Sequence, residues 1–213
     1  MAAASDVDQG VADPRAEENR RRILAAAEEL IAVHGVEKVR LRDIATQAGV
    51  SVGMIQHYFD TRDGVIDAMM GAASVRRVTE WATIAAHVED PTTKLVTLLE
   101  HAVDDRQRCT IWLATTSAAS RDERYRQDVE INYRSWRAQL IEVIELGYER
   151  DHFAATGVDV IEIVDTILSV IDGLMAAVAM NLDTYTPERN TRMLRRVAGL
   201  LLGVDLESSA AHA

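Results

Sequence analysis

Apolar residues recur at steps of three and four along most of this chain, and that spacing constrains the fold more than any other feature. Val160, Val164, Ile167, Ile171 and Leu174 follow this rule in one stretch. The spacing places apolar side chains on one face of an α-helix. No run alternates between apolar and polar residues as a half-buried strand does. The sequence therefore predicts an all-α fold.

Helix boundaries follow from capping residues. Asp and Thr cap helix N-termini, Pro fits the first turn, and Gly ends helices in the left-handed conformation. We accordingly predict a first helix that ends at Gly35 in a left-handed cap. Further breaks are predicted at Asp90-Pro91, near Ser120, around Gly157 and at Thr186-Pro187.

Two short predicted helices meet at a glycine turn near residue 50. The segment from Leu41 places Ile44 and Ala48 on one face. Gly49 permits a sharp turn that a residue with a Cβ would resist, and the Ser51 hydroxyl is suited to cap the next helix. Helix, glycine turn and helix together form a helix-turn-helix pattern.

The charge distribution limits where nucleic acid can bind. A formal net charge of −11 argues against a protein that binds nucleic acid over its whole surface. Residues 1–14 carry −3, residues 15–62 carry +1 and residues 63–213 carry −9. Any DNA contact is therefore predicted within residues 15–62.

The segment from Arg40 to Met69 resembles the DNA-binding domain of the TetR family of regulators. The resemblance implies that a recognition helix enters the major groove, that Arg42 reaches bases or phosphate, and that Tyr58 and Arg62 contact phosphate. The matching positions are Arg42-Asp43-Ile44-Ala45, Ala48-Gly49-Val50-Ser51, Gly53, Ile55, Tyr58-Phe59 and Arg62. The implied recognition-helix contacts are Val52, Gly53, Met54, Gln56 and His57.

Two positions depart from the pattern of that family. Gln56 stands where Tyr is common, and Gln can form two hydrogen bonds to adenine, so base readout is expected to differ. Arg40 stands where a capping Thr is common, and we place it among the DNA contacts because it can reach phosphate. The alternative for Arg42 and Arg62 is an ordinary solvated charge, and for Tyr58 a purely core position.

Residues from about 90 to 205 resemble, more loosely, the C-terminal domain of the BetI-like subgroup. The matching features are Asp90-Pro91, the helix with Trp112, the helix with Tyr133 and Trp136, and Ile171-Asp172-Gly173-Leu174. The resemblance implies a ligand cavity among the fifth to eighth helices. It also implies a homodimer formed by the last two helices. Each of these helices carries two apolar stripes, so we predict that part of the second stripe buries against another copy of the chain, with the interface at residues 158–181 and 187–204.

The predicted effector site combines aromatic and acidic side chains. Aromatic faces near carboxylates suit a cationic ligand such as a quaternary amine or a polyamine. The alternative for Trp112 and Trp136 is an ordinary core position, and Asp104 is a further possible charged partner. The candidate lining residues are Trp112, Thr116, Tyr133, Trp136, Arg137, Asp165, Asp172 and Met175.

These patterns give one domain organisation and one function. We predict a disordered arm at 1–14, a helix-turn-helix domain at 15–62, a ligand-binding and dimerisation domain at 63–205 and a disordered tail at 206–213. The predicted protein is a cytoplasmic homodimeric repressor of operator DNA that responds to a small-molecule effector. No cofactor, metal site or membrane segment is predicted.

Three other functions compete with this one. An enzyme would need an activated nucleophile or clustered metal ligands, whereas Cys109 is the only cysteine and the histidines are scattered. The motif between Arg40 and Arg62 argues against a purely structural helical dimer. Activation instead of repression stays open, because operator position decides the sign of regulation.

Overall fold

The computed structural model describes residues 14–207, and helices account for almost all of this part of the chain. No strand occurs among these residues, so the predicted all-α fold is confirmed. The helices are α1 (Pro14–His34), α2 (Leu41–Ala48), α3 (Val52–Phe59), α4 (Arg62–His87), α5 (Pro91–Val103), α6 (Arg106–Ala119), α7 (Glu123–Glu149), α8 (Val160–Ala179) and α9 (Pro187–Leu202), with a 3-10 turn, η1 (Val36–Lys38), after α1.

Polar caps begin most of the later helices. Asp90 accepts a hydrogen bond from the Thr93 amide at 2.7 Å at the start of α5. A break that we did not predict separates α5 from α6, where Asp105 accepts from the Arg108 amide at 2.8 Å. The left-handed cap predicted at Gly35 is wrong: its φ is 80° but its ψ is 156°, because the chain turns directly into η1.

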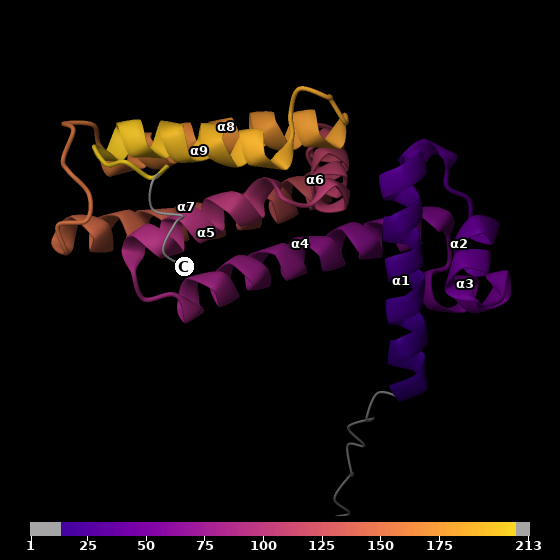
Figure 1. Cartoon of the computed structure of the whole chain (residues 1–213). Coiled ribbons are helices and arrows are strands. Elements are labelled where there is room, and N and C mark those ends of the chain that lie inside the picture. The colour runs from indigo at the N-terminus through magenta and orange to yellow at the C-terminus, as the bar shows by residue number, and fades with distance from the viewer. Residues whose placement is uncertain (1–13, 208–213) are drawn as a thin grey trace, which may run out of the picture. The chain divides into compact units, whose positions relative to one another are not determined.

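The chain divides into two compact units within α4, after Met69. In the first unit α1 packs on α2 and α2 packs on α3. Their contact is filled by Ile23 and Ile31 from α1, Ile44 from α2, and Ile55 from α3, all of them buried. This small core holds together α1, α2 and α3, which lie next to one another in Figure 1.

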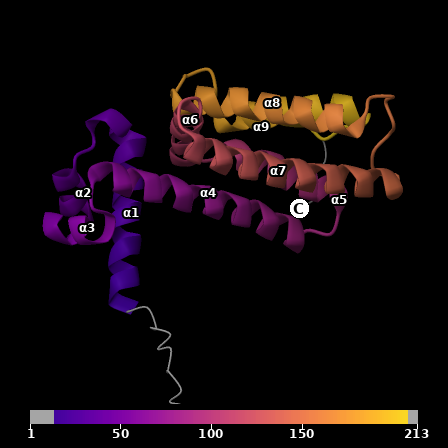
Figure 2. The ribbon, with the colours of Figure 1, turned by 180° about the vertical axis from the view of Figure 1, so that it is seen from behind.

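The second unit contains most of α4 and all of α5 to α9. Helix α8 contacts α5, α6, α7 and α9, and the two last helices lie side by side (Figures 1 and 2). Helix α8 supplies much of the core, including Ile163, Ile167 and Ile171. No helix of the described chain is both long and apolar enough to cross a membrane.

The chain ends differ from the predicted boundaries. The predicted arm lies outside the described residues except for Pro14, which begins α1. Two residues of the tail predicted from residue 206 are described: Leu206 is buried in the core, and Glu207 pairs with Arg196 at 2.8 Å. Its remaining residues, 208–213, also lie outside the described chain.

Candidate DNA-binding surface and effector site

The turn between α2 and α3 has the predicted geometry. Gly49 adopts the left-handed conformation, with φ 65° and ψ 40°. Ser51 caps α3 by accepting a hydrogen bond from the Met54 amide at 3.1 Å. At the start of α2, where Arg40 supplies no capping oxygen, Asp43 accepts from the Arg40 amide at 3.1 Å. Gly49 and Ser51 therefore form the turn before α3, and the Asp43 carboxylate takes the place of a side-chain cap at the start of α2.

Helix α3 presents one exposed polar face. Its buried residues are Ile55 and Phe59, which hold it against the rest of the first unit. The candidate DNA contacts that are exposed are Arg40, Arg42, Val52, Gly53, Gln56 and His57, and those that are partly buried are Met54, Tyr58 and Arg62. The fold thus leaves the predicted base-reading residues open to a partner, and their contact with DNA stays a prediction.

Arg62 is held within the first unit. Its Nε donates to the Val39 carbonyl at 2.6 Å, and its Nη2 donates to the Val36 carbonyl. Its Nη1 also lies 2.9 Å from the Asp63 carboxylate. These bonds tie the start of α4 to the η1 turn. A phosphate contact at Arg62 stays a prediction, and removing this side chain would disturb the fold as well as any DNA contact.

Helix α1 contributes two basic residues that we did not single out from the sequence. The Arg22 guanidinium donates to the carbonyl of Ala48, the last residue of α2. The Arg20 guanidinium lies 4.7 Å from the centre of the Phe59 ring. Both cations therefore join α1 to the helix-turn-helix. Their place three residues and one residue before Ile23, where the apolar stripe of α1 begins, was the only sequence signal, and it does not separate such a role from a solvated charge.

Replacing Gln56 tests base readout. We expect Gln56→Ala to lose about 1–3 kcal/mol of discrimination at one base pair of the operator, because a bidentate contact to adenine would be removed. Competition binding with single-base operator variants measures this loss. Thr46→Ala, which removes an exposed α2 hydroxyl that bonds its own helix, is the control. Equal weakening on operator and random DNA would remove Gln56 from the base-reading set.

The second unit holds a cluster of four aromatic rings, Trp81, Trp112, Tyr133 and Trp136, which we term the aromatic cluster. The ring centre of Trp136 lies 5.3 Å from that of Trp81, 4.9 Å from that of Trp112 and 5.9 Å from that of Tyr133. These rings come from α4, α6 and α7. The chain has three tryptophans, and all three belong to this cluster.

Asp172 of α8 joins two of these rings. One carboxylate oxygen accepts from the Trp112 Nε1 at 3.1 Å, and the other accepts from the Tyr133 hydroxyl. Burial, followed by this hydrogen bond to Asp172, raises the pKa of Tyr133 above its usual value, so the phenol stays protonated and keeps donating. The structure therefore brings together four predicted lining residues, Trp112, Tyr133, Trp136 and Asp172.

Arg77 of α4 lies against the same rings. Its guanidinium carbon is 4.9 Å from the centre of the Trp112 ring and 5.8 Å from that of Trp136. Its Nη2 donates to the Arg108 carbonyl at 3.0 Å. We did not identify Arg77 and Trp81 from the sequence. Their four-residue spacing was the available signal, because it places both side chains on one face of α4.

The other predicted lining residues have different surroundings. Met175 is buried in the core, and the Thr116 hydroxyl donates to carbonyls of its own helix. Arg137 and Asp165 pair with each other at 2.8 Å in an exposed ion pair between α7 and α8. Asp104 pairs with Arg108. A ligand contact at any of these residues stays a prediction.

Cys109 lies on α6 and is fully buried. Burial raises the pKa of its thiol to about 11, so the thiol is protonated at neutral pH and is a poor nucleophile. Within residues 14–207, no group of three or more potential metal ligands comes together.

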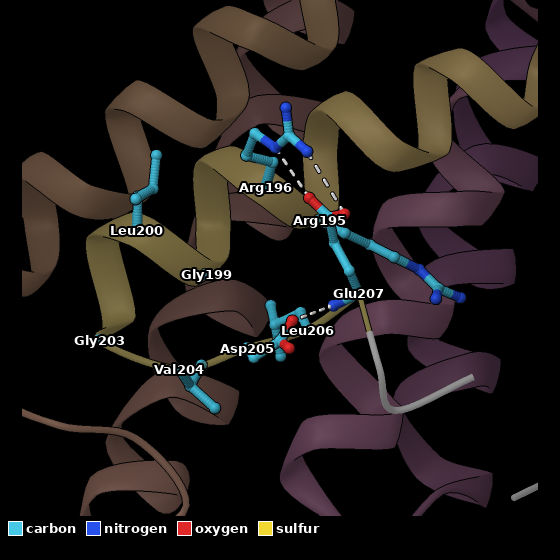
Figure 3. A pocket seen from close by; sticks show the side chains of 9 residues that line it. All are labelled: Arg195, Arg196, Gly199, Leu200, Gly203, Val204, Asp205, Leu206 and Glu207. Atoms are coloured by element: carbon cyan, nitrogen blue, oxygen red, sulfur yellow. Dashed lines mark hydrogen bonds and ion pairs between the residues drawn. The ribbon is translucent and has the colours of Figure 1, made fainter. Parts of the chain in front are cut away.

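A surface hollow of about 460 Å³ lies where α9 ends (Figure 3). It is lined by residues of α9 and of the turn after it, including Leu200 and Leu206. Figure 3 shows the Glu207 carboxylate reaching back to the Arg196 guanidinium across this hollow. A second hollow of about 410 Å³ is lined by Arg189, Arg192, Met193 and Arg196. The outer face of α9 is thus basic and uneven.

Two family profiles match this chain. Residues 23–69 match bacterial regulatory proteins of the tetR family, and residues 91–203 match the C-terminal part of BetI-type transcriptional repressors. The second match alone covers more than half of the chain. The chain belongs to the TetR family of transcriptional regulators. Its family relatives and fold neighbours are regulators and not enzymes.

Among curated proteins, this TetR-family chain is similar to the HTH-type transcriptional regulator PksA of Bacillus subtilis (strain 168). The two are 28% identical over 107 residues, which is 48% of this chain and 52% of PksA. The chain therefore spans about half the length of this curated relative.

Two solved structures share the fold. A regulator from Saccharomonospora viridis, solved in complex with choline, has a TM-score of 0.77 at 23% identity and covers 84% of this chain and 95% of its own. FadR from Bacillus subtilis, solved in complex with stearoyl-CoA, has a TM-score of 0.64 at 20% identity, with coverage of 85% and 97%. Both likenesses concern the fold.

Proposed function

We propose that this chain is a cytoplasmic, homodimeric repressor that binds an inverted-repeat operator and releases it when a small organic cation binds at the aromatic cluster. The observation that carries the proposal is the meeting of four rings with the Asp172 carboxylate in the second unit. Aromatic faces attract cations through their quadrupoles, and a carboxylate adds a full opposite charge. A small quaternary amine matches both features.

The proposal that the chain binds an operator rests on the first unit. An exposed recognition helix lies on a rigid core in the part of the chain that carries its only positive net charge. A two-fold dimer presents two such helices to successive turns of the major groove, which requires an inverted repeat. The match to BetI-type repressors favours repression over activation of transcription.

The proposal that the chain forms a homodimer rests on exposed apolar side chains of the last two helices and the turn between them. Leu200 is 75% exposed although it belongs to the apolar stripe predicted for α9. Ile161 on α8, and Met180 and Leu182 just after that helix, are exposed as well. Exposed apolar groups on neighbouring elements typically mark an interface, and a two-fold dimer buries the same patch on both subunits.

The choline complex of the Saccharomonospora viridis regulator supports a cationic effector for this chain, since the two proteins share their fold. The stearoyl-CoA complex of FadR shows that this fold also accepts a different ligand. Cation recognition therefore rests on the rings and the carboxylate of this chain, and choline is a suitable probe.

Operator release tests the proposed function. Genomic fragments selected with the purified protein would supply the operator, and fluorescence anisotropy would then give its affinity with and without choline. We expect choline to weaken operator binding by about 5–150-fold, and operator to weaken choline binding by the same factor, because the coupling is reciprocal. The matched control is 3,3-dimethyl-1-butanol, which has the shape of choline without its charge. Equal operator affinity with and without choline would refute this effector class.

A further inference from the structure

Arg77 is an unusual residue to find in a protein core. Its side chain is 5% exposed, and within the described chain no carboxylate lies within ion-pair distance of its guanidinium. Burial, followed by repulsion from Arg108, lowers its pKa to about 10, so it still carries its charge at neutral pH. A buried charge without an ionic partner is costly to keep, and such groups gather at functional sites.

The surroundings of Arg77 explain how the charge is held. The Trp112 and Trp136 rings face its guanidinium, and the Arg108 carbonyl accepts one of its hydrogen bonds. The Asp172 carboxylate accepts hydrogen bonds from the Trp112 Nε1 and the Tyr133 hydroxyl rather than from Arg77. The ring faces that would attract a ligand cation therefore already hold a cation of the protein itself.

Trp136 supplies an independent observation. It is 2% exposed, and its Nε1 has no hydrogen-bond partner among the described residues. A buried indole N–H normally finds an acceptor. An unsatisfied donor within the aromatic cluster indicates a place for an acceptor atom that the chain does not supply. A cation that also carries a hydroxyl or carbonyl oxygen would satisfy both the rings and this donor.

We propose that Arg77 is a resident cation that competes with the effector, so that a ligand cation binds the aromatic cluster only by displacing the Arg77 guanidinium. This inference rests on the proposed function. It adds the residue that sets the effector concentration needed for binding. Two cations against the same pair of rings would repel each other in a desolvated site, so they exclude each other. Arg77 lies on α4, which also contributes residues 62–69 to the DNA-binding unit. The exchange therefore acts on a helix that both units share.

The central test replaces Arg77 with a neutral side chain of similar length. We expect Arg77→Met to bind choline about 10-fold more tightly than the native protein, because the ligand no longer displaces a bound cation. Tryptophan fluorescence measures this binding directly, since all three tryptophans lie in the cluster. Arg77→Lys keeps the positive charge and is expected to retain an affinity close to that of the native protein.

A measurement of operator release shows whether Arg77 competes with the effector or only stabilises the fold. With Arg77→Met, saturating choline should weaken operator binding much less than in the native protein, because no group is displaced on α4. Tighter choline binding together with weaker release is the result that supports competition. Arg134→Met removes an exposed arginine of α7 and is the matched control for the lost charge, with native behaviour expected in both assays.

A second variant keeps the proposal testable if the Arg77→Met protein does not fold. Arg77→Ala removes the guanidinium and its stem, so added ethylguanidinium should bind that variant and change its fluorescence while leaving the native protein unaffected. Choline binding that is equal or weaker in Arg77→Met than in the native protein would overturn the competition while leaving the effector class intact. If neither choline nor ethylguanidinium bound any of the variants, both the competition and the proposed effector class would be overturned. Binding of choline to Arg77→Met alone would support the resident cation and reject choline as the native effector.

Discussion

The Leu200→Arg variant is expected to be monomeric at micromolar concentration and to bind operator DNA about 10²–10⁴-fold more weakly than the native protein, because the two half-sites are then no longer engaged together. Leu200 is 75% exposed on α9, so the substitution leaves the core of the chain unchanged. In the proposed dimer it would bury an unpaired charge beside Arg196, one helical turn earlier on the same face. Sedimentation velocity and anisotropy titrations on a full operator measure the two effects.

The control for this experiment is Ile131→Arg, which places the same charge on an apolar residue of α7 that is 48% exposed and lies outside the proposed interface. We expect this variant to stay dimeric. A Leu200→Arg protein that remains dimeric with native operator affinity would exclude α9 as the interface. Leu174 is unsuitable for this test, because it is buried within the core and an arginine there would unfold the second unit.

The Trp136→Ala variant is expected to lose about 3–5 kcal/mol of unfolding free energy, which is the usual cost of removing a large buried aromatic side chain. Trp136 contacts three other rings and is 2% exposed. Its removal leaves a cavity that three helices, α4, α6 and α7, would have to fill. Denaturant unfolding followed by circular dichroism measures the change.

Two further variants make this result specific. Trp136→Phe keeps a ring in place and breaks no hydrogen bond that the described residues provide, so its loss should be clearly smaller. Val33→Ala truncates a residue of α1 that is 71% exposed, and its effect should stay within about 0.5 kcal/mol. A loss below about 1 kcal/mol for Trp136→Ala would mean that the aromatic cluster is not part of the stabilising core.

The local structure of the DNA-binding unit could be predicted from short stretches of sequence. Gly49, Ser51 and the apolar residues that follow act within a few positions of one another, so their roles can be derived from spacing alone. The same holds for the proline breaks before α5 and α9. The break at Asp104-Asp105 was missed because two acidic residues without Pro or Gly are weak helix terminators.

The apolar periodicity of α8 and α9 predicted helices but not the partner of each face. Leu168 and Met175 lie on the second apolar stripe of α8, and both are buried within this chain. Leu200 shares the three- and four-residue spacing of the apolar residues of α9, yet it is exposed. Spacing shows which side chains share a face of a helix, whereas the element that covers this face depends on helix packing.

The composition of the proposed effector site depends on how separate helices pack together. Trp112, Tyr133, Trp136 and Asp172 were identifiable from the sequence because they match a family pattern, but Arg77 and Trp81 were not. These six residues come from α4, α6, α7 and α8, across nearly 100 positions of the chain. Arg137 and Asp165 were predicted from the sequence to line this site, and in the structure they pair with each other on the surface. A cation held by aromatic faces leaves no short-range signature in the sequence, because its partners are brought to it by the packing of separate helices.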